Sequence, residues 1–292
     1  MMKIRNLLIF LLVGLALTGC SGPSIKKIDV VKKIDFEEVQ WYALRAAAAY
    51  KSEKDIRQAF PQTVRVATVS DTKIQYFIEV FPESRLQLIS VRGTANLKNG
   101  LEDAEYFQSK NGKLGIYVHR GFDAVTTKIY EDVLPHLKTD YAVKTTGHSL
   151  GAAVSTLLMM YMHQDGYRIE KSINFGQPKV TNKAGVSAYG YLPLTRVVDE
   201  NDVVPLVPPV TLLDSLHGIY EHLGDELILL KGKDYVYLDK HDAARKSVGD
   251  FWKNLGRQSI KEHFMANYLK NIKGKLKTAI QVPYGTRAEK IP

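Results

Sequence analysis

The stretch Gly147-His148-Ser149-Leu150-Gly151 decides the fold of this chain. It fits the pattern G-x-S-x-G, in which a serine occupies a sharp, strained turn between a β-strand and an α-helix, with its hydroxyl exposed at the top of a sheet. The two glycines follow from steric contacts, because strand and helix pass so close to the serine that a Cβ atom at either position would collide with them. The pattern therefore predicts a strand that ends before Ser149 and a helix that starts after it.

The residues on either side of this turn agree with that prediction. Residues 141–146 are aromatic and β-branched, with no proline or glycine, which is typical of a strand. Residues 152–160 are apolar on every side, which is typical of a buried helix. Strand, turn and helix therefore follow one another in the order that the motif requires.

The rest of the sequence alternates between runs typical of strands and runs typical of helices. Such alternation favours an α/β fold with a mostly parallel central sheet and helices on both faces. No internal repeat and no second domain can be recognised in the sequence. We expect helices over Asp35–Tyr50, Phe122–Leu137 and Ile260–Ile272, and strands over Ile74–Val80, Leu86–Val91, Lys171–Gly176, Leu194–Asp199, Glu226–Leu230 and Tyr235–Leu238.

The composition is that of a globular protein, with 292 residues, of which 45% are hydrophobic and 24% charged. The net charge is +9. The basic residues occur along the whole chain, and their main cluster is in the C-terminal tail. The sequence has no zinc-finger spacing, no aromatic RNA-binding motif and no basic helix with heptads, so we expect no nucleic-acid partner. A solvated surface or a surface that faces anionic lipid accounts for the charge equally simply.

The N-terminus is typical of a targeting segment. Lys3 and Arg5 precede an apolar run, residues 7–17, that is too short to span a bilayer. The run ends in Leu17-Thr18-Gly19-Cys20, which resembles the lipobox of bacterial lipoproteins, and Cys20 is the only cysteine. We therefore expect a signal peptide over residues 1–19 and lipid attachment at Cys20. Several acyl chains on one residue anchor a protein to a membrane more firmly than one chain does.

Three further segments complete the expected organisation. Residues 20–34 are short, polar and basic and predict a tether, residues 35–273 form the folded domain, and residues 274–292 form a loose basic tail. Ser21, rather than an aspartate, follows the lipidated cysteine, which resembles an outer-membrane sorting signal. The expected location is therefore the bacterial cell envelope, on the outer membrane.

A nucleophilic serine needs a base to accept its proton and a carboxylate to orient that base. In folds with this turn the partners follow in the order serine, acid, histidine, and the acid lies at the end of a later strand. Asp202 fits this position, in the loop that follows the strand-like run 194–199. Asp199 is the alternative, although its side chain at the strand end could instead satisfy the backbone of the loop.

Four histidines follow Asp202 in the sequence. His263 lies at the start of the expected last helix, where it projects from the first turn toward a sheet edge. His222 is the second candidate. It precedes the strand-like run 226–230, and a histidine in that position is more often packed or hydrogen-bonded than catalytic. The other two are His217 and His241, and His241 lies in a charged turn that is typical of solvated residues.

The oxyanion formed during acyl transfer requires two backbone donors. One is the amide of the residue that follows the nucleophile, here Leu150. The other should come from a loop after an earlier strand, and Arg92-Gly93-Thr94 follows the strand-like run 86–91. This loop supplies a flexible glycine and a hydroxyl.

With these pieces together, the chain resembles the class 3 (fungal-type) lipase family from about Asp35 to Ile272. The family's nucleophile falls on Ser149, its acid on Asp202 and its base on His263, and its oxyanion donors fall on Thr94 and Leu150. The resemblance implies the α/β-hydrolase fold and no metal or organic cofactor. The motifs that carry it are Val91-Arg92-Gly93-Thr94, Val118-His119-Arg120-Gly121-Phe122, Gly147-His148-Ser149-Leu150-Gly151, Asn174-Phe175-Gly176-Gln177-Pro178, Asn201-Asp202-Val203-Val204-Pro205 and His263.

The resemblance also implies a function. It indicates a serine hydrolase that cleaves carboxylic esters of lipids, similar to a triacylglycerol lipase, through an acyl-enzyme intermediate. Phospholipase A1 or short-chain carboxylesterase activity is the closest alternative, and a ligand- or partner-binding lipoprotein is the non-enzymatic one. A lid would cover about Ala95 to Phe107, and it lacks the tryptophan and the strong apolar stripe typical of family lids, so we expect no strong interfacial activation.

Overall fold

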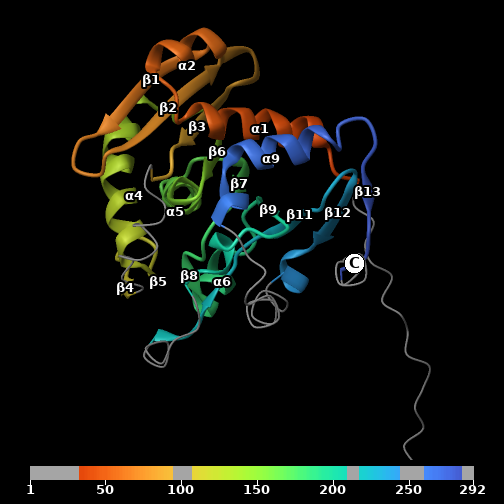
Figure 1. The fold of residues 1–292 in the computed structure, drawn as a ribbon. Helices are drawn as coiled ribbons and strands as arrows, with labels where there is room; N and C mark the ends of the chain where they lie inside the picture. Colours follow the sequence, from red (N-terminus) through yellow and green to blue (C-terminus); the bar gives the residue numbers. More distant parts are fainter. Residues whose placement is uncertain (1–32, 95–106, 209–216, 244–259, 285–292) are drawn as a thin grey trace, which may run out of the picture. The chain divides into compact units, whose positions relative to one another are not determined.

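The computed structural model describes residues 33–94, 107–208, 217–243 and 260–284 of the chain. In this part of the chain a nine-stranded sheet has the strand order β1-β2-β3-β6-β7-β9-β11-β12-β13 (Figure 1). The strands are β1 Thr63–Val69, β2 Ile74–Phe81, β3 Leu86–Val91, β6 Ala142–His148, β7 Ile169–Phe175, β9 Leu194–Asp199, β11 Asp225–Leu229, β12 Asp234–Leu238 and β13 Ile280–Gln281.

The middle of this sheet is parallel. Strands β3, β6, β7, β9 and β11 each pair in parallel with the next. Strands β1 and β2 add antiparallel pairs on the β3 side, and β12 pairs antiparallel with β11 on the other side. The expected, mostly parallel central sheet is therefore confirmed. Since the parallel strands all end at one edge, the loops that follow them come together there.

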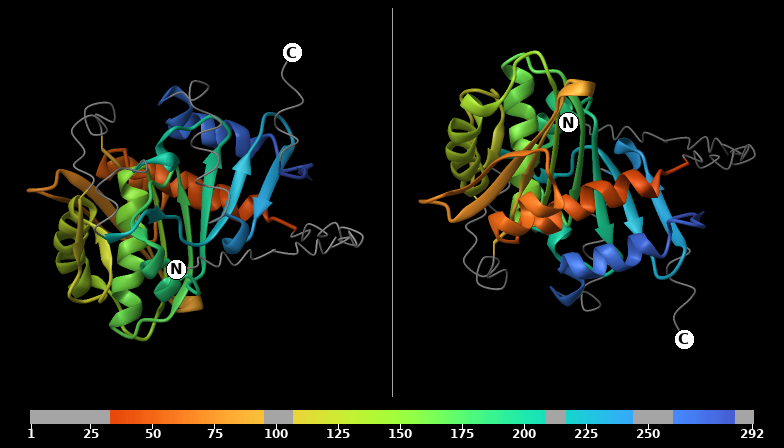
Figure 2. Two further views of the ribbon diagram at one scale, coloured as in Figure 1. Left: turned by 90° about the horizontal axis from the view of Figure 1, so that it is seen from below. Right: turned by 90° about the horizontal axis from the view of Figure 1, so that it is seen from above.

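Helices cover both faces of the sheet, as expected. Helices α1 (Phe36–Ala48) and α9 (Met265–Lys273) lie side by side on one face (Figure 1), and α5 (Leu150–Gln164) lies on the other, with α4 (Arg120–Val133) packed against it (Figure 2). Each layer has its own hydrophobic core against the sheet. The shorter helices are α2 Glu53–Ala59, α6 Lys183–Tyr189 and the 3-10 turns Pro82–Ser84, Leu134–His136, Val204–Leu206 and Ile260–His263.

Helix α5 begins directly after the serine of the G-x-S-x-G motif. Every residue from Gly151 to Met162 is buried between the sheet and α4. This confirms the buried helix that the apolar run predicts, and it places the motif between a largely buried strand, β6, and a largely buried helix, α5.

A second sheet of the described chain consists of short antiparallel strands in the order β10-β8-β5-β4. Their pairing depends on contacts between distant segments, such as the amide of Asn182, which donates to Gln108 Oε1 at 3.2 Å. The sequence analysis did not predict this sheet. Its strands are β4 Gln108–Lys110, β5 Tyr117–His119, β8 Thr181–Asn182 and β10 Tyr220–Glu221.

The last helix differs from the continuous helix expected over residues 260–272. A 3-10 turn ends at His263, Phe264 is extended with φ −69° and ψ 136°, and α9 begins only at Met265. The reason is tertiary, because the carbonyl of His263 accepts a hydrogen bond from the ring of His148 at 2.6 Å. A carbonyl engaged in this way does not contribute to a regular helical ladder.

The expectation of a loose tail from Gly274 onward is wrong for residues 275–284. Lys275 is only 1% exposed, and its ammonium group donates to the carbonyls of Leu230 at 2.7 Å and Gly232 at 2.9 Å. Further along, β13 pairs with β12 and extends the sheet. The C-terminal segment therefore closes one edge of the fold as far as residue 284.

Several expectations lie outside the described residues. They are the signal peptide with Cys20 and most of the tether, residues 95–106 of the expected lid, and the end of the tail. Within the described part of the chain, no helix combines the length and apolar character needed to cross a membrane.

Candidate active site

The expected site residues follow the ends of neighbouring parallel strands. Thr94 lies in the loop after β3, Ser149 directly after β6, and Asp202 in the loop after β9. Gly176 follows β7, which lies between β6 and β9 in the sheet. The topology alone thus brings three of the expected functional residues to one edge, which is where open α/β sheets place their ligand sites.

Ser149 has the strained backbone that the motif requires. Its φ of 60° and ψ of −129° are rare for a residue with a side chain. A Cβ atom on Gly147 would lie 2.2 Å from the carbonyl oxygen of Gly151, and one on Gly151 would lie 2.3 Å from that of Val91. These contacts agree with the steric argument for both glycines.

Ser149 is less accessible than the sequence argument expects, with only 3% of the residue exposed. The neighbouring strand ends crowd it, since a Cβ atom on Gly93 would lie 2.9 Å from the Cβ atom of Ser149. The expectation that the hydroxyl is exposed to solvent is therefore wrong, and the serine lies in an enclosed position at the sheet edge.

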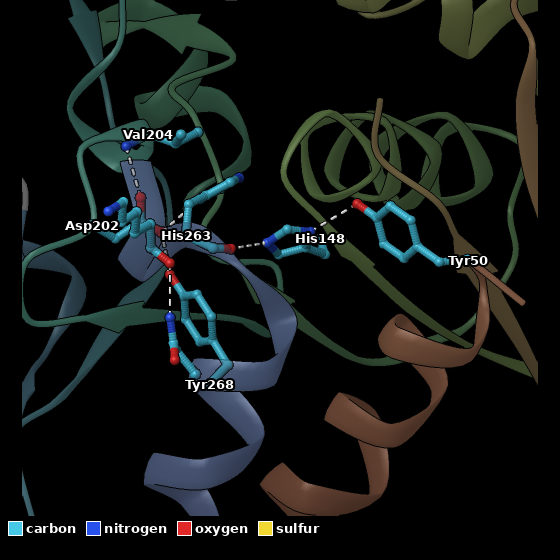
Figure 3. Close-up of polar contacts among 8 residues, drawn as sticks. Tyr50, His148, Asp202, Val204, His263 and Tyr268 are labelled. Carbon is cyan, nitrogen blue, oxygen red and sulfur yellow. Dashed lines mark hydrogen bonds and ion pairs between the residues drawn. The ribbon is translucent and has the colours of Figure 1, made fainter. Parts of the chain in front are cut away.

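Asp202 and His263 form a buried pair (Figure 3). The Nδ1 atom of His263 lies 2.7 Å from Oδ2 of Asp202, and the two residues are 1% and 4% exposed. The other carboxylate oxygen, Oδ1, accepts the backbone N–H of Val204 at 2.8 Å. The carboxylate is thus held from both sides, which fixes the orientation of the imidazole.

The alternative acid and base make other contacts. Asp199 accepts a hydrogen bond from the Asn271 side chain at 2.6 Å. His222 is buried, and its Nε2 atom donates to the carbonyl of Pro205 at 2.6 Å. That bond holds the backbone just after Asp202, so His222 supports the loop that contains Asp202. His241 is exposed to solvent.

The second ring nitrogen of His263 is the chemically important one. Nε2 is buried and has no hydrogen-bond partner among the described residues. The ring of His148, the residue before Ser149, lies 4.4 Å from that of His263 between centroids. The structure therefore brings the serine turn and the His263 ring together without a hydrogen bond between Ser149 and Nε2. Catalytic hydrogen bonds of this kind often form only once a substrate is bound.

The loop after β3 is held against the serine turn by Tyr50. The Tyr50 hydroxyl accepts the backbone N–H of Gly93 at 3.1 Å and lies 2.8 Å from Nδ1 of His148. This places Gly93, the residue before Thr94, against the serine turn. The N–H of Leu150 is one of the first helical amides of α5 and has no acceptor within the helix. Thr94 and Leu150 are thus the expected pair of donors to an oxyanion.

The protonation of this network follows from burial. Burial lowers the pKa of His148 well below its ordinary value, so the ring is neutral. Burial raises the pKa of Tyr50 to about 12, so its hydroxyl keeps its proton. Tyr50 therefore donates to Nδ1 of His148, and Nε2 of that ring donates to the carbonyl of His263. One chain of hydrogen bonds links the β3 loop, the serine turn and the backbone of the base.

Three residues of this site were missed by the sequence analysis as contributors. His148 lies inside the motif, which was the available signal. Tyr268, whose hydroxyl bonds Asp202, lies on α9 five residues after His263, and the extended Phe264 between them removes any helical spacing that could have signalled the contact. Tyr50 is 98 residues from His148 in sequence, and no local pattern indicates their contact.

Replacing Gly176 by alanine is expected to lower kcat/KM for ester hydrolysis about 100-fold, the typical effect of displacing a catalytic group by about 1 Å. Gly176 has φ +55°, and a Cβ atom there would lie 2.6 Å from Cε1 of His263 and 2.9 Å from Oδ2 of Asp202. Gly166→Ala is the matched control, because Gly166 has φ +84° and nothing within 4 Å of a new Cβ atom. Equal activity loss in both variants would contradict this reading.

The free energy of unfolding should respond to pH through Asp199. Burial raises the pKa of Asp199 to about 6. The folded protein therefore holds a proton that the unfolded chain releases above about pH 4. The contribution of this group to stability is complete below about pH 4 and is lost as the pH rises through about 6.

Asp199→Asn removes this titration. Relative to the wild type, the variant should gain about 2 kcal/mol of unfolding free energy between pH 4 and pH 7. Urea unfolding at both pH values measures the gain, with the exposed Glu131→Gln as the control. A stability difference between wild type and Asp199→Asn that does not change with pH would contradict the prediction.

Comparison with known proteins agrees with the fold. Among solved structures, lipase II from Rhizopus niveus superposes with a TM-score of 0.62 at 22% identity, over 78% of this chain and 92% of that one. The triacylglyceride lipase of Rhizomucor miehei does so with a TM-score of 0.64 at 20% identity, with the same coverage. The chain therefore has the α/β-hydrolase fold.

Comparison of the sequence with known families and proteins indicates the family. The model of the family Lipase (class 3) matches residues 88–212, and this part of the chain belongs to that family. Similar curated proteins are the secreted mono- and diacylglycerol lipase 1 of Fusarium solani, 31% identical over 51% of this chain and 46% of the relative, and a lipase of Rhizomucor miehei, 32% identical over 41% and 37%. The chain spans about half the length of the curated relatives that head the comparison.

Proposed function

We propose that this protein is a serine hydrolase that cleaves carboxylic esters of lipids, similar to a triacylglycerol lipase. The observation that carries the proposal is the buried Asp202–His263 pair, whose Nε2 atom has no partner among the described residues, beside the strained turn of Ser149. A serine hydroxyl becomes a nucleophile when such a nitrogen accepts its proton.

The reaction then follows from the positions of these groups. Ser149 Oγ attacks the ester carbonyl and its proton passes to Nε2 of His263. Asp202 stabilises the imidazolium, and the N–H groups of Thr94 and Leu150 bind the oxyanion. The imidazolium returns the proton to the leaving alcohol, and water activated by His263 hydrolyses the acyl-enzyme. Side chains, backbone N–H groups and one water molecule supply every step, and no cofactor is proposed.

A lipid substrate is supported by the relatives and by the surface beside the base. The similar proteins include secreted mono- and diacylglycerol lipases. Phe264, the residue after His263, is 58% exposed although it is large and apolar. An exposed aromatic ring next to the catalytic base suits an acyl chain better than it suits water.

We further propose that the mature protein is a bacterial lipoprotein anchored to the outer membrane through Cys20. The support is the lipobox-like segment that ends at Cys20. Metabolic labelling with radioactive palmitate tests this, since Cys20→Ser should abolish the label. Label that persists in Cys20→Ser would overturn the anchor and leave the hydrolase proposal untouched.

The substrate proposal is tested by fatty-acid release from triacylglycerol, diacylglycerol, a phospholipid and a short-chain ester, measured with the purified protein. Fastest release from the acylglycerols supports the proposal. Fastest release from the sn-1 position of the phospholipid, or from the short ester, replaces the substrate class and keeps the chemistry. No release from any of the four favours a binding protein on this fold.

A further inference from the structure

Tyr268 makes a contact with the catalytic acid that the proposed reaction does not use. It lies on α9, is fully buried, and its hydroxyl is 2.5 Å from Oδ2 of Asp202. The same oxygen lies 2.7 Å from Nδ1 of His263. Two donors, a phenol and an imidazole, therefore share one carboxylate oxygen (Figure 3).

The direction of the Tyr268 bond is fixed by chemistry. Burial and the neighbouring Asp202 carboxylate raise the pKa of Tyr268 well above its ordinary value, so the phenol keeps its proton and donates it. Its ring packs edge-on against Phe175 and His148, with centroids 6.0 Å apart in each case. The hydroxyl is thus held at the carboxylate by packing on both sides of the ring.

We propose that Tyr268 is a positioning residue that sets the basicity of His263 by sharing the Oδ2 atom of Asp202. A hydrogen bond to a carboxylate draws negative charge toward the donor, so less is left to stabilise an imidazolium on the same oxygen. With Tyr268 in place, His263 gives up its proton at a lower pH and is a free base over a wider range. This inference rests on the proposed function.

Other charged or titratable groups also lie around the pair. His148 contacts the His263 ring and is neutral, and it also binds Tyr50. On β9, Asp199 interacts electrostatically with Asp202, with Glu262 before α9 and with Lys275 after it. Removing the hydroxyl of Tyr268 leaves these side chains in place but also removes its hydrogen bond with the backbone of Asp199, so the titration is followed on the His263 ring itself as well as in the rate.

The test is Tyr268→Phe, measured by the pH dependence of kcat/KM and by NMR titration of the His263 ring. The acid limb and the ring titration should both move to higher pH by about half to one unit, about half the effect of a whole charge-assisted hydrogen bond, because the lost bond acts on the ring only through the shared carboxylate. At alkaline pH, where His263 is deprotonated in both proteins, kcat/KM should fall less than tenfold. The NMR titration needs no turnover, so it tests Tyr268 even if the wild type hydrolyses no ester.

Tyr42→Phe is the matched control. Tyr42 is also a fully buried tyrosine, on the neighbouring helix α1, and its hydroxyl has no hydrogen-bond partner among the described residues. Its loss should leave both midpoints unchanged. Midpoints that stay fixed in Tyr268→Phe, or that move to lower pH, overturn the proposal.

A second variant covers the case in which Tyr268→Phe does not fold. Incorporation of 3-fluorotyrosine at position 268 keeps the ring and the hydroxyl but makes the phenol a stronger donor. Both midpoints should then move to lower pH, opposite to the phenylalanine variant. A purely structural role for Tyr268 predicts no movement in this variant and would be the conclusion if none occurs.

Discussion

Ser149→Ala is expected to lower kcat for ester hydrolysis by about 10⁶-fold, the loss seen when the nucleophile of a serine triad is removed. The variant keeps the fold, because the strained turn is set by Gly147 and Gly151 rather than by the hydroxyl. A residual rate above that of water should remain from the oxyanion donors. The measurement is fatty-acid release by pure protein at saturating substrate.

The chain offers a matched control for this variant. Ser155 lies on α5, the helix that follows Ser149, is fully buried, and its Oγ atom has no hydrogen-bond partner among the described residues. Ser155→Ala removes the same kind of atom two turns into the helix and should leave kcat unchanged. If Ser149→Ala kept kcat within tenfold of the wild type, the hydroxyl would not be the nucleophile and the proposed chemistry would fail.

Asp202→Asn is expected to lower kcat by about 10⁴-fold while the fold is retained. The carboxylate accepts Nδ1–H of His263 and so keeps Nε2 as the basic nitrogen. An asparagine can present its NH₂ group to the ring instead, which favours the other tautomer and removes the base. The negative charge that stabilises the imidazolium is lost as well.

Asp199→Asn distinguishes this effect from a general loss of acidic charge. Asp199 lies three residues earlier, is 3% exposed and is bonded to Asn271 rather than to a histidine. Its substitution should change kcat less than tenfold. A larger loss of kcat from Asp199→Asn than from Asp202→Asn would show that Asp199, and not Asp202, is the acid.

The sequence is informative at this site where the constraint is local. The glycines around Ser149 can be predicted because the clash they avoid involves backbone atoms only a few residues away or on the adjacent strand. The edge at which Thr94, Ser149 and Asp202 meet can also be predicted, because parallel strands end together.

Contacts between distant segments explain what could not be predicted. Asp202 is 66 residues from Tyr268, and the Tyr50–His148 contact spans 98 residues, so neither leaves a periodic pattern in the sequence. The break at Phe264 has the same origin, because the His148 ring binds the carbonyl of His263. The ordered C-terminal segment depends on a buried ammonium group of Lys275, whereas a run of basic residues is usually typical of a solvated tail.

The most direct test of the central claim is covalent labelling with a serine-directed phosphonate ester, located by mass spectrometry of the digested protein. The account predicts one phosphonyl group per molecule, on Ser149, formed at least about 1,000-fold more slowly in His263→Ala because no base accepts the serine proton. An adduct on another residue, or labelling of Ser149 at the same rate without His263, would contradict it.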